Sequence, residues 1–143
     1  MLGTLAKWLR IYGFDTFYVD SEIDDEGLME IAKKEKRVLI TRDKDLIIKA
    51  KKELIKIIQV EKTGIDNELS VVLNEIDIDK SKILSRCTIC NIILDEIKKS
   101  EIKNKVAEKV FENNEKFWFC SKCKRIYWKG THYENMIDKI KNQ

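Results

Sequence analysis

Hydrophobic residues at the start of the chain recur at helical spacing. Leu2, Leu5, Leu9 and Tyr12 lie three or four positions apart, so they share one face of a helix. Gly13 suits the C-cap of that helix, because glycine readily adopts the left-handed backbone conformation that ends many helices. The pattern therefore predicts an N-terminal helix with an apolar stripe.

Three more helices are predicted further along, and short apolar runs alternate with them. The helices begin near Asp25, near Asp43, and after Gly64, where Asp66 suits an N-cap. The runs that have the pattern of strands are residues 16–19, 38–40 and 55–60. Strands separated by helical stretches of about 10–15 residues are typical of βαβ units. We therefore expect an α/β domain with a parallel sheet.

The pattern changes after the polar stretch 77–86, which we take as a domain boundary. The chain then carries two cysteine pairs separated by 29 residues, and a tail in which Thr131 opens a capping-box pattern. The apolar residues of that tail recur at helical spacing and predict a terminal helix: Met136, Ile137 and Ile140. The expected organisation is an α/β domain over residues 1–80 and a cysteine module with a C-terminal helix over residues 81–143.

The only four cysteines, Cys87, Cys90, Cys120 and Cys123, form two C-x-x-C pairs. Each pair can hold a metal ion from a tight turn, and two such turns complete a tetrahedral shell of four sulfur ligands. Thiolate ligands in this coordination select zinc, with iron as the commonest mimic. The alternatives are two disulfides or a redox dithiol, although neither pair lies at the strand-to-helix junction typical of a redox motif. We expect one structural zinc ion in a ribbon-type module, since four protein ligands leave no position for a substrate.

Two cations and then two aromatic residues follow the second cysteine pair, at Lys124, Arg125, Tyr127 and Trp128. Cations pair with phosphates and exposed aromatic rings stack on unpaired bases, so this segment is a candidate RNA-binding surface. The alternatives are that the aromatic residues pack the small ribbon and that the cations form a solvated face. His132, the single histidine, is a candidate phosphate contact or general acid, with a structural role as the alternative.

Composition adds a few constraints. Charged residues make up 37% of the 143 residues, proline is absent, and Lys, Glu and Ile are abundant, which resembles the composition of thermophile proteins. The net charge of +3 permits a nucleic-acid partner without requiring one. The chain has neither a signal-peptide pattern nor an apolar run of the roughly 18 residues that span a bilayer. We therefore expect a cytoplasmic protein without a membrane partner.

Acidic residues follow the predicted strand 38–40. Asp43 and Asp45 come next in the chain, and ligands bind beyond the carboxyl ends of parallel strands. Asp25 begins the preceding predicted helix and can approach the same edge of the sheet. Clustered carboxylates repel unless a divalent cation neutralises them, and oxygen ligands suit Mg²⁺ or Mn²⁺. The alternative is that these aspartates only cap helices.

Three segments of the chain resemble a known family: LGTLAKWLRIYGFDT, DDEGLMEIAKKEKRVLITRDKDL and FWFCSKCKRIYWKGTHYENM. Together they resemble the Mut-seven C-terminal RNase domain family over nearly the whole length. The resemblance implies a PIN-like three-layer parallel sheet with helices on both faces, followed by a C-terminal zinc ribbon. It also implies a metal-dependent ribonuclease in which Asp25, Asp43 and Asp45 bind Mg²⁺ or Mn²⁺.

The family pattern usually begins with a strand that ends in an aspartate, ahead of the segment that starts here at Met1. We therefore expect the parallel sheet of this chain to lack its first strand. We expect the acidic site to lack the carboxylate that this strand carries.

Three functional hypotheses follow. The leading one is a metal-dependent ribonuclease whose zinc ribbon assists RNA binding. Its candidate phosphate contacts in the α/β domain are Lys7, Arg10 and Arg42, with the solvated face of the first helix as the alternative for Lys7 and Arg10. The second hypothesis is a non-catalytic RNA- or ribosome-binding adapter, which the missing carboxylate favours. The third is a toxin-like nuclease with a protein partner.

Overall fold

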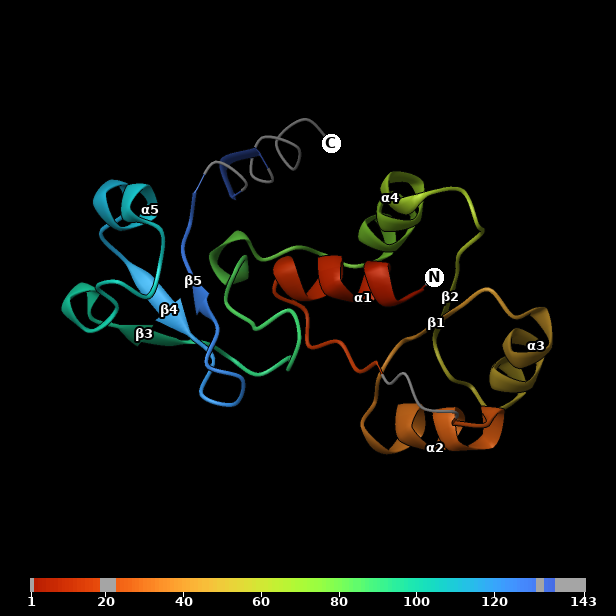
Figure 1. The fold of residues 1–143 in the computed structure, drawn as a ribbon. Coiled ribbons are helices and arrows are strands. Elements are labelled where there is room, and N and C mark those ends of the chain that lie inside the picture. Colours follow the sequence, from red (N-terminus) through yellow and green to blue (C-terminus); the bar gives the residue numbers. More distant parts are fainter. Residues whose placement is uncertain (1, 19–22, 131–132, 136–143) are drawn as a thin grey trace. The chain divides into compact units, whose positions relative to one another are not determined.

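The chain forms two compact units in a computed structural model, which describes residues 2–18, 23–130 and 133–135 (Figure 1). The first unit consists of Met1–Ala6 and Phe17–Ile78, and the second of Lys7–Thr16 and Asp79–Gln143. Helix α1, Leu2–Ile11, therefore begins in the first unit and ends in the second. The sequence-based boundary placed residues 7–16 with the first domain, whereas the structure groups them with the unit that holds the cysteines.

The first unit is a mixed α/β structure with a short parallel sheet. Its helices after α1 are α2, α3 and α4, which span Asp25–Lys34, Lys44–Lys52 and Ile65–Glu75. Its strands are β1, Leu39–Thr41, and β2, Ile57–Gln59, which pair in parallel with Leu39 opposite Ile57. The parallel pairing of the two strands and their alternation with α2, α3 and α4 agree with the sequence-based expectation.

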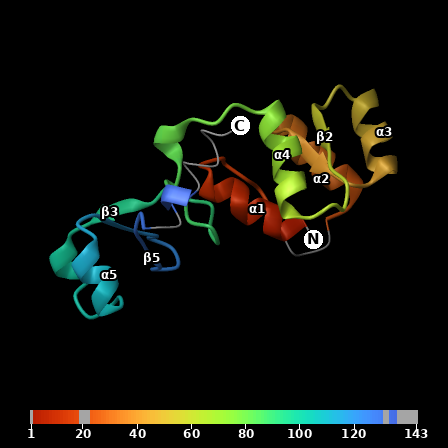
Figure 2. The same cartoon turned by 90° about the horizontal axis from the view of Figure 1, so that it is seen from above.

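The core of the first unit forms where α2 and α3 lie side by side next to the strands (Figures 1 and 2). Its buried side chains come from both helices and from the turn that follows α3: Met29, Ala32, Leu46, Ala50 and Ile55. Leu39 of β1 and Ile57 of β2 pack against this cluster. The helical spacing of apolar residues thus brings both helices onto the strands.

The helix starts of the first unit differ in how they are capped. Asp24 accepts a hydrogen bond from the backbone N–H of Gly27 at 2.8 Å and so caps α2. The N-cap of α4 is Gly64, which makes no side-chain bond. The prediction that Asp66 caps this helix is therefore wrong, because the helix begins at Ile65 and places Asp66 in its first turn.

No strand forms at residues 16–18, and Val19 lies outside the described part of the chain. The backbone groups of Thr16 make other bonds: its N–H donates to Asn91 Oδ1 at 2.9 Å, and its carbonyl accepts from Arg10 Nε at 3.1 Å. The prediction of a strand at 16–19 is wrong for its described residues, because the β propensity of the run is overridden by these longer-range bonds.

The second unit contains a three-stranded antiparallel sheet with the order β3-β4-β5 (Figure 1). The strands span Asp95–Ile97, Phe117–Phe119 and Ile126–Tyr127. Helix α5, Glu108–Asn113, lies between β3 and β4 in the chain, and 3₁₀ turns span Lys80–Lys82 and Lys99–Glu101. The largest fully buried side chains of this unit are Ile83, Ile102 and Phe117. This core is small, and small units usually need a further stabilising element, such as a bound metal ion, to stay folded.

Gly13 ends helix α1, as the sequence predicts. Its N–H donates to the carbonyl of Arg10 and the N–H of Phe14 donates to the carbonyl of Leu9, each at 3.0 Å, which is a Schellman motif. The φ angle of Gly13 is +96°, and a Cβ added there would lie 2.4 Å from the carbonyl oxygen of Lys82. Glycine is therefore required both by the backbone conformation and by the close approach of the chain.

The predicted C-terminal helix lies mostly outside the described residues. Thr131, His132 and residues 136–143 are not described, so the expected cap and the apolar face of this helix stay predictions. Among the described residues, no helix is long and apolar enough to cross a membrane.

Candidate functional site

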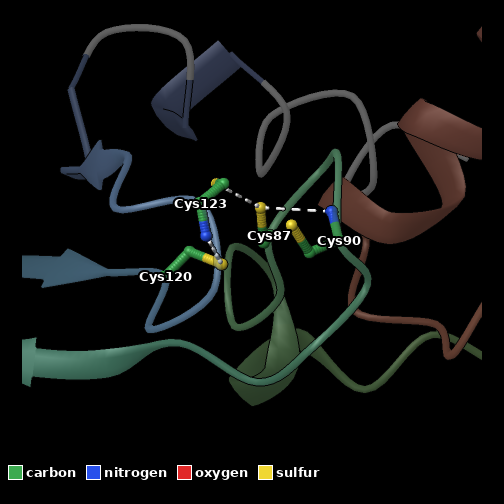
Figure 3. A group of neighbouring side chains, drawn as sticks. All are labelled: Cys87, Cys90, Cys120 and Cys123. Atoms are coloured by element: carbon green, nitrogen blue, oxygen red, sulfur yellow. Dashed lines mark hydrogen bonds between the residues drawn. The ribbon is translucent and has the colours of Figure 1, made fainter.

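The second unit brings the four cysteines together (Figure 3). One ligand atom from each of Cys87, Cys90, Cys120 and Cys123 lies within 4.8 Å of the others. Cys87 and Cys120 are fully buried, while Cys90 and Cys123 are half-buried. In the described part of the chain this is the only group of three or more Cys, His, Asp or Glu residues placed to hold a metal ion.

The two C-x-x-C turns have the same backbone hydrogen bonds. The N–H of Asn91 donates to the carbonyl of Cys87 at 2.9 Å, and the N–H of Lys124 donates to the carbonyl of Cys120 at 2.8 Å. The N–H of Cys90 also donates to Cys87 Sγ at 3.3 Å, and the N–H of Cys123 donates to Cys120 Sγ at 3.4 Å. Bonds of this kind orient each sulfur and stabilise its thiolate form. We call the two turns the first and the second knuckle.

The distances between the sulfurs fit a metal ion rather than disulfides. Cys87 Sγ and Cys123 Sγ lie 3.6 Å apart, and all four cysteines are free. A disulfide requires about 2.05 Å. Two thiolates that share a tetrahedral zinc ion with bonds of about 2.3 Å lie about 3.8 Å apart. The donor set therefore fits a structural metal such as zinc, and the disulfide interpretation is wrong.

The pKa values of the thiols also fit a bound cation. Burial opposes ionisation of Cys87, but hydrogen bonds from Tyr127 and from the N–H of Cys90 lower its pKa to about 6. Burial, hydrogen bonds to Cys120 and Cys123, and the charge of Cys87 raise the pKa of Cys90 to about 12. The Cys87 thiolate thus forms readily, and its negative charge opposes ionisation of Cys90. A divalent cation is therefore needed to hold several thiolates together.

Tyr127 of β5 supports the first knuckle from the second unit's sheet. Its hydroxyl lies 3.2 Å from Cys87 Sγ, and the N–H of Thr88 donates to the Tyr127 oxygen at 3.3 Å. Burial raises the pKa of Tyr127, and the bond to Cys87 raises it further. The hydroxyl therefore stays protonated and donates a hydrogen bond to the Cys87 thiolate.

We predict that Tyr127→Phe weakens zinc binding about tenfold or more, because the variant removes this hydrogen bond to a ligand sulfur while the ring is kept. Competition with a chromophoric zinc chelator measures the affinity. Tyr133→Phe is the control, because Tyr133 belongs to the same unit and its ring lies beside Lys129 rather than at a cysteine. An unchanged affinity in Tyr127→Phe would show that the hydroxyl does not tune the metal site.

Arg10 of α1 holds the first knuckle from another direction. Its Nη1 donates to the carbonyls of Thr88 and Ile89 at 2.9 and 3.1 Å, and its Nε donates to the carbonyl of Thr16. The residue is only 8% exposed. The sequence made Arg10 a candidate phosphate contact, but this placement favours a structural role.

Asn91 is a structural residue of the first knuckle that the sequence did not single out. Its φ angle is +65°, a conformation that asparagine tolerates better than most residues. Its side chain accepts from the N–H of Thr16 and donates to Asp15 Oδ1 at 2.7 Å. The position directly after a C-x-x-C pair is the signal that could have indicated it, because the turn needs a left-handed residue there.

The candidate carboxylates lie in the first unit. Asp43 follows β1 and caps α3: its Oδ1 accepts from the N–H groups of Asp45 and Leu46 at 2.9 and 3.3 Å. The capping alternative is therefore correct for Asp43, and its exposed carboxylate keeps Oδ2 available to a ligand. Asp45 is exposed in the first turn of α3.

Asp25 lies in the first turn of α2 and pairs with Lys49 of α3 at 3.5 Å. The structure does not bring Asp25, Asp43 and Asp45 within 4.8 Å of one another, since the described residues contain no such acidic group. The three acids therefore do not form a ready-made metal site of the kind that the cysteines form.

The cations predicted to contact phosphates near these acids differ in their surroundings. Arg42 makes an ion pair with Glu68 of α4, whose side chain is 7% exposed. This placement favours a structural role for Arg42. Lys7 is exposed on α1.

The four candidate RNA-binding residues beside the second knuckle line one open cavity of about 410 Å³. They are Lys124, Arg125, Tyr127 and Trp128. Lys105, which the sequence did not single out, lines the same cavity. His132, the remaining candidate, lies outside the described residues.

Comparison with known proteins gives one match. The family model described as Mut7-C RNAse domain matches residues 1–140, which is nearly the whole chain. Searches of curated proteins and of solved structures each found no significant match.

Proposed function

The chain belongs to the Mut7-C RNAse domain family, and from this premise we propose that it is a metal-dependent ribonuclease that cleaves RNA phosphodiester bonds. The single observation that carries the proposal, besides the family, is the position of Asp43. It stands two residues beyond the carboxyl end of β1, where open parallel sheets bind ligands. Its free Oδ2 and its exposure leave it accessible to a substrate-bound cation.

Asp43, Asp45 and Asp25 would hold Mg²⁺ or Mn²⁺, because carboxylate oxygens are the ligands these hard cations prefer. Such a cation supplies an activated water and stabilises charge on the leaving oxygen. The two hydrogen bonds that Asp43 Oδ1 accepts from backbone N–H groups of α3 orient the carboxylate, and with it the free Oδ2. Asp25 joins the site only by giving up its ion pair with Lys49.

The proposal includes a PIN-like arrangement of the first unit and a zinc ribbon in the second that assists RNA binding. The parallel pair β1 and β2 with helices α2, α3 and α4 supports the former. The two knuckles and the antiparallel sheet β3-β4-β5 support the latter.

Asp43→Asn tests the proposal. We expect Mn²⁺-dependent cleavage of single-stranded RNA to fall at least about a hundredfold, because the variant removes a charged ligand of the cation. Asparagine is as good an N-cap as aspartate, so α3 keeps its start and the fold is retained. A fluorescently labelled RNA, followed by gel electrophoresis with and without Mn²⁺, measures the rate.

Asp77→Asn is the matched control, since Asp77 is an exposed aspartate of the same unit that belongs to no candidate site. It should cleave RNA like the unmodified chain. Intact RNA in the unmodified chain, or equal cleavage by Asp43→Asn, would contradict the proposal.

A second candidate function is a non-catalytic RNA- or ribosome-binding adapter. The separation of the three acids and the ion pair between Asp25 and Lys49 favour it. An adapter would retain RNA without turnover, and its binding would not change in Asp43→Asn. A filter-binding assay run beside the cleavage assay therefore distinguishes the two functions.

A further inference from the structure

The two knuckles have the same backbone conformation but differ in the residue at the position with a left-handed φ angle. Asn91 of the first knuckle and Lys124 of the second have φ angles of +65° and +66°. The side chain of Asn91 is used within the protein, where it bonds to Thr16 and Asp15. Lys124 makes no ion pair with any described residue, although it occupies the equivalent place.

A lysine at this position has no structural advantage. The left-handed conformation is unfavourable for most L-residues, and glycine or asparagine reduces that cost. Strained residues that persist often serve a site, because the surrounding structure must hold them in place. Lys36, Leu54 and Leu84 adopt the same conformation elsewhere in the chain, so a role for Lys124 rests on its charge and on its place at the cavity.

Lys124 shares its cavity with two other cations. Lys105, from the segment before α5, and Arg125 line the same space, and none of the eight lining residues is acidic. All three cations are exposed and make no ion pair with the described part of the chain. Three unpaired cations around one cavity attract an anion, because none of their charge is neutralised by the protein.

Two other lysines of the same unit are engaged within it. Lys99 pairs with Glu115 at 3.3 Å, and Lys129 lies over the rings of Trp118 and Tyr133, 5.2 and 5.0 Å from their centroids. Lys105, Lys124 and Arg125 differ from these two lysines, because they line one cavity and make no ion pair with a described residue.

Two aromatic residues complete the cavity. Trp128 packs against Phe117, with ring centroids 6.5 Å apart, and the hydroxyl of Tyr127 is bonded to Cys87 and Thr88. Both rings are thus held in place on one side while they line the cavity on the other. A fixed aromatic ring beside cations favours a ligand that has both a flat base and a phosphate.

We propose that this cavity binds one unpaired nucleotide of an RNA strand. Lys105, Lys124 and Arg125 contact the flanking phosphates, and the base stacks on an aromatic ring of the cavity. A duplex is disfavoured, because its bases are already stacked on each other and cannot reach a ring. The proposal rests on the RNA substrate proposed above, and it makes the second knuckle the part of the chain that selects single-stranded RNA.

Lys124→Asn is the decisive variant, since it gives the second knuckle the residue that the first knuckle uses. Asparagine suits the left-handed backbone, so zinc content and thermal stability should be kept or improved. We expect the affinity of the zinc-loaded full chain for a single-stranded oligoribonucleotide to fall about fivefold, as measured by fluorescence anisotropy. The slope of log K against log salt should lose about 0.7, the share of one phosphate contact on a single strand.

Lys105→Gln tests the third cation, with Lys103→Gln as its matched control two residues away outside the cavity. We expect Lys105→Gln to weaken binding like Lys124→Asn, and Lys103→Gln to leave it unchanged. Trp128→Phe should remove the quenching of tryptophan fluorescence that RNA binding produces in the unmodified chain. Equal affinity for the RNA strand and for its duplex with a complement would overturn the proposal, as would unchanged affinity in Lys124→Asn.

The outcomes also separate this proposal from the proposed activity. Weaker binding in Lys124→Asn without any cleavage by the unmodified chain supports the nucleotide site and rejects the ribonuclease. Metal-dependent cleavage that loses activity in Asp43→Asn, together with full affinity in Lys124→Asn, supports the ribonuclease and rejects the nucleotide site.

Discussion

Removal of the metal with a chelator is expected to unfold the second unit of the chain. Cys87 and Cys120 are fully buried and form a core cluster with Leu94, so the ligands are themselves part of the core. Structural zinc contributes about 10–16 kcal/mol to the folding of small zinc modules, far more than a core of this size supplies alone. Near-UV circular dichroism of Trp118 and Trp128, recorded before and after chelation, measures the loss of tertiary structure.

The metal itself is checked by elemental analysis, which should find one zinc ion per chain. Cys120→Ser should show the same loss of tertiary signal without a chelator. Added zinc should restore the unmodified chain after chelation but should not restore the variant. A near-UV spectrum that stays unchanged once the metal is gone would show that the second unit folds without it.

Arg10→Ala is expected to lower the free energy of unfolding by about 4 kcal/mol, because it leaves three carbonyls without their donor. Two of these carbonyls belong to the first knuckle, between Cys87 and Cys90. We therefore also expect weaker zinc binding. Urea unfolding followed by tryptophan fluorescence gives the stability, and chelator competition gives the zinc affinity.

Lys7→Ala is the matched control, since Lys7 is a cation of the same helix that is exposed. Its effect should stay within about 0.5 kcal/mol. Arg10→Lys should lose most of the stability as well, because an ammonium lacks the planar fork of donors that reaches two sites at once. A stability of Arg10→Ala equal to that of Lys7→Ala would contradict the structural role of Arg10.

The metal centre could be predicted because its signal is local. Two pairs of cysteines at fixed spacing determine a pair of turns, and the hydrogen bonds of these turns involve residues close in sequence. The helices with apolar faces, such as α3, could be predicted for the same reason, since their periodicity is contained in a few turns.

The errors come from contacts between distant parts of the chain. Residues 16–18 have the composition of a strand, but Thr16 bonds to Asn91, 75 positions away. Arg10 has the spacing of a solvated cation, yet two of its three acceptors lie 78 and 79 positions along the chain. A pattern read from neighbouring residues contains no information about such pairings.

The proposed nucleotide site combines residues that could be predicted from local sequence with one that could not. Lys124 and Arg125 follow a cysteine pair and could be singled out from their position. Lys105 lies in a lysine-rich stretch with no feature that separates it from Lys103 or Lys109. Only the folded second unit places Lys105 at the same cavity as the second knuckle.

The division of helix α1 between the two units bears on how the protein is made. The chain enters the second unit at Lys7, leaves it at Thr16, and returns only at Asp79. During synthesis Arg10 emerges from the ribosome 78 residues before its acceptor Thr88, a delay of about 4 to 16 s at usual elongation rates. The N-terminal residues of the second unit are therefore made long before the residues that they bond to, and a gene fragment that begins at residue 81 lacks Arg10.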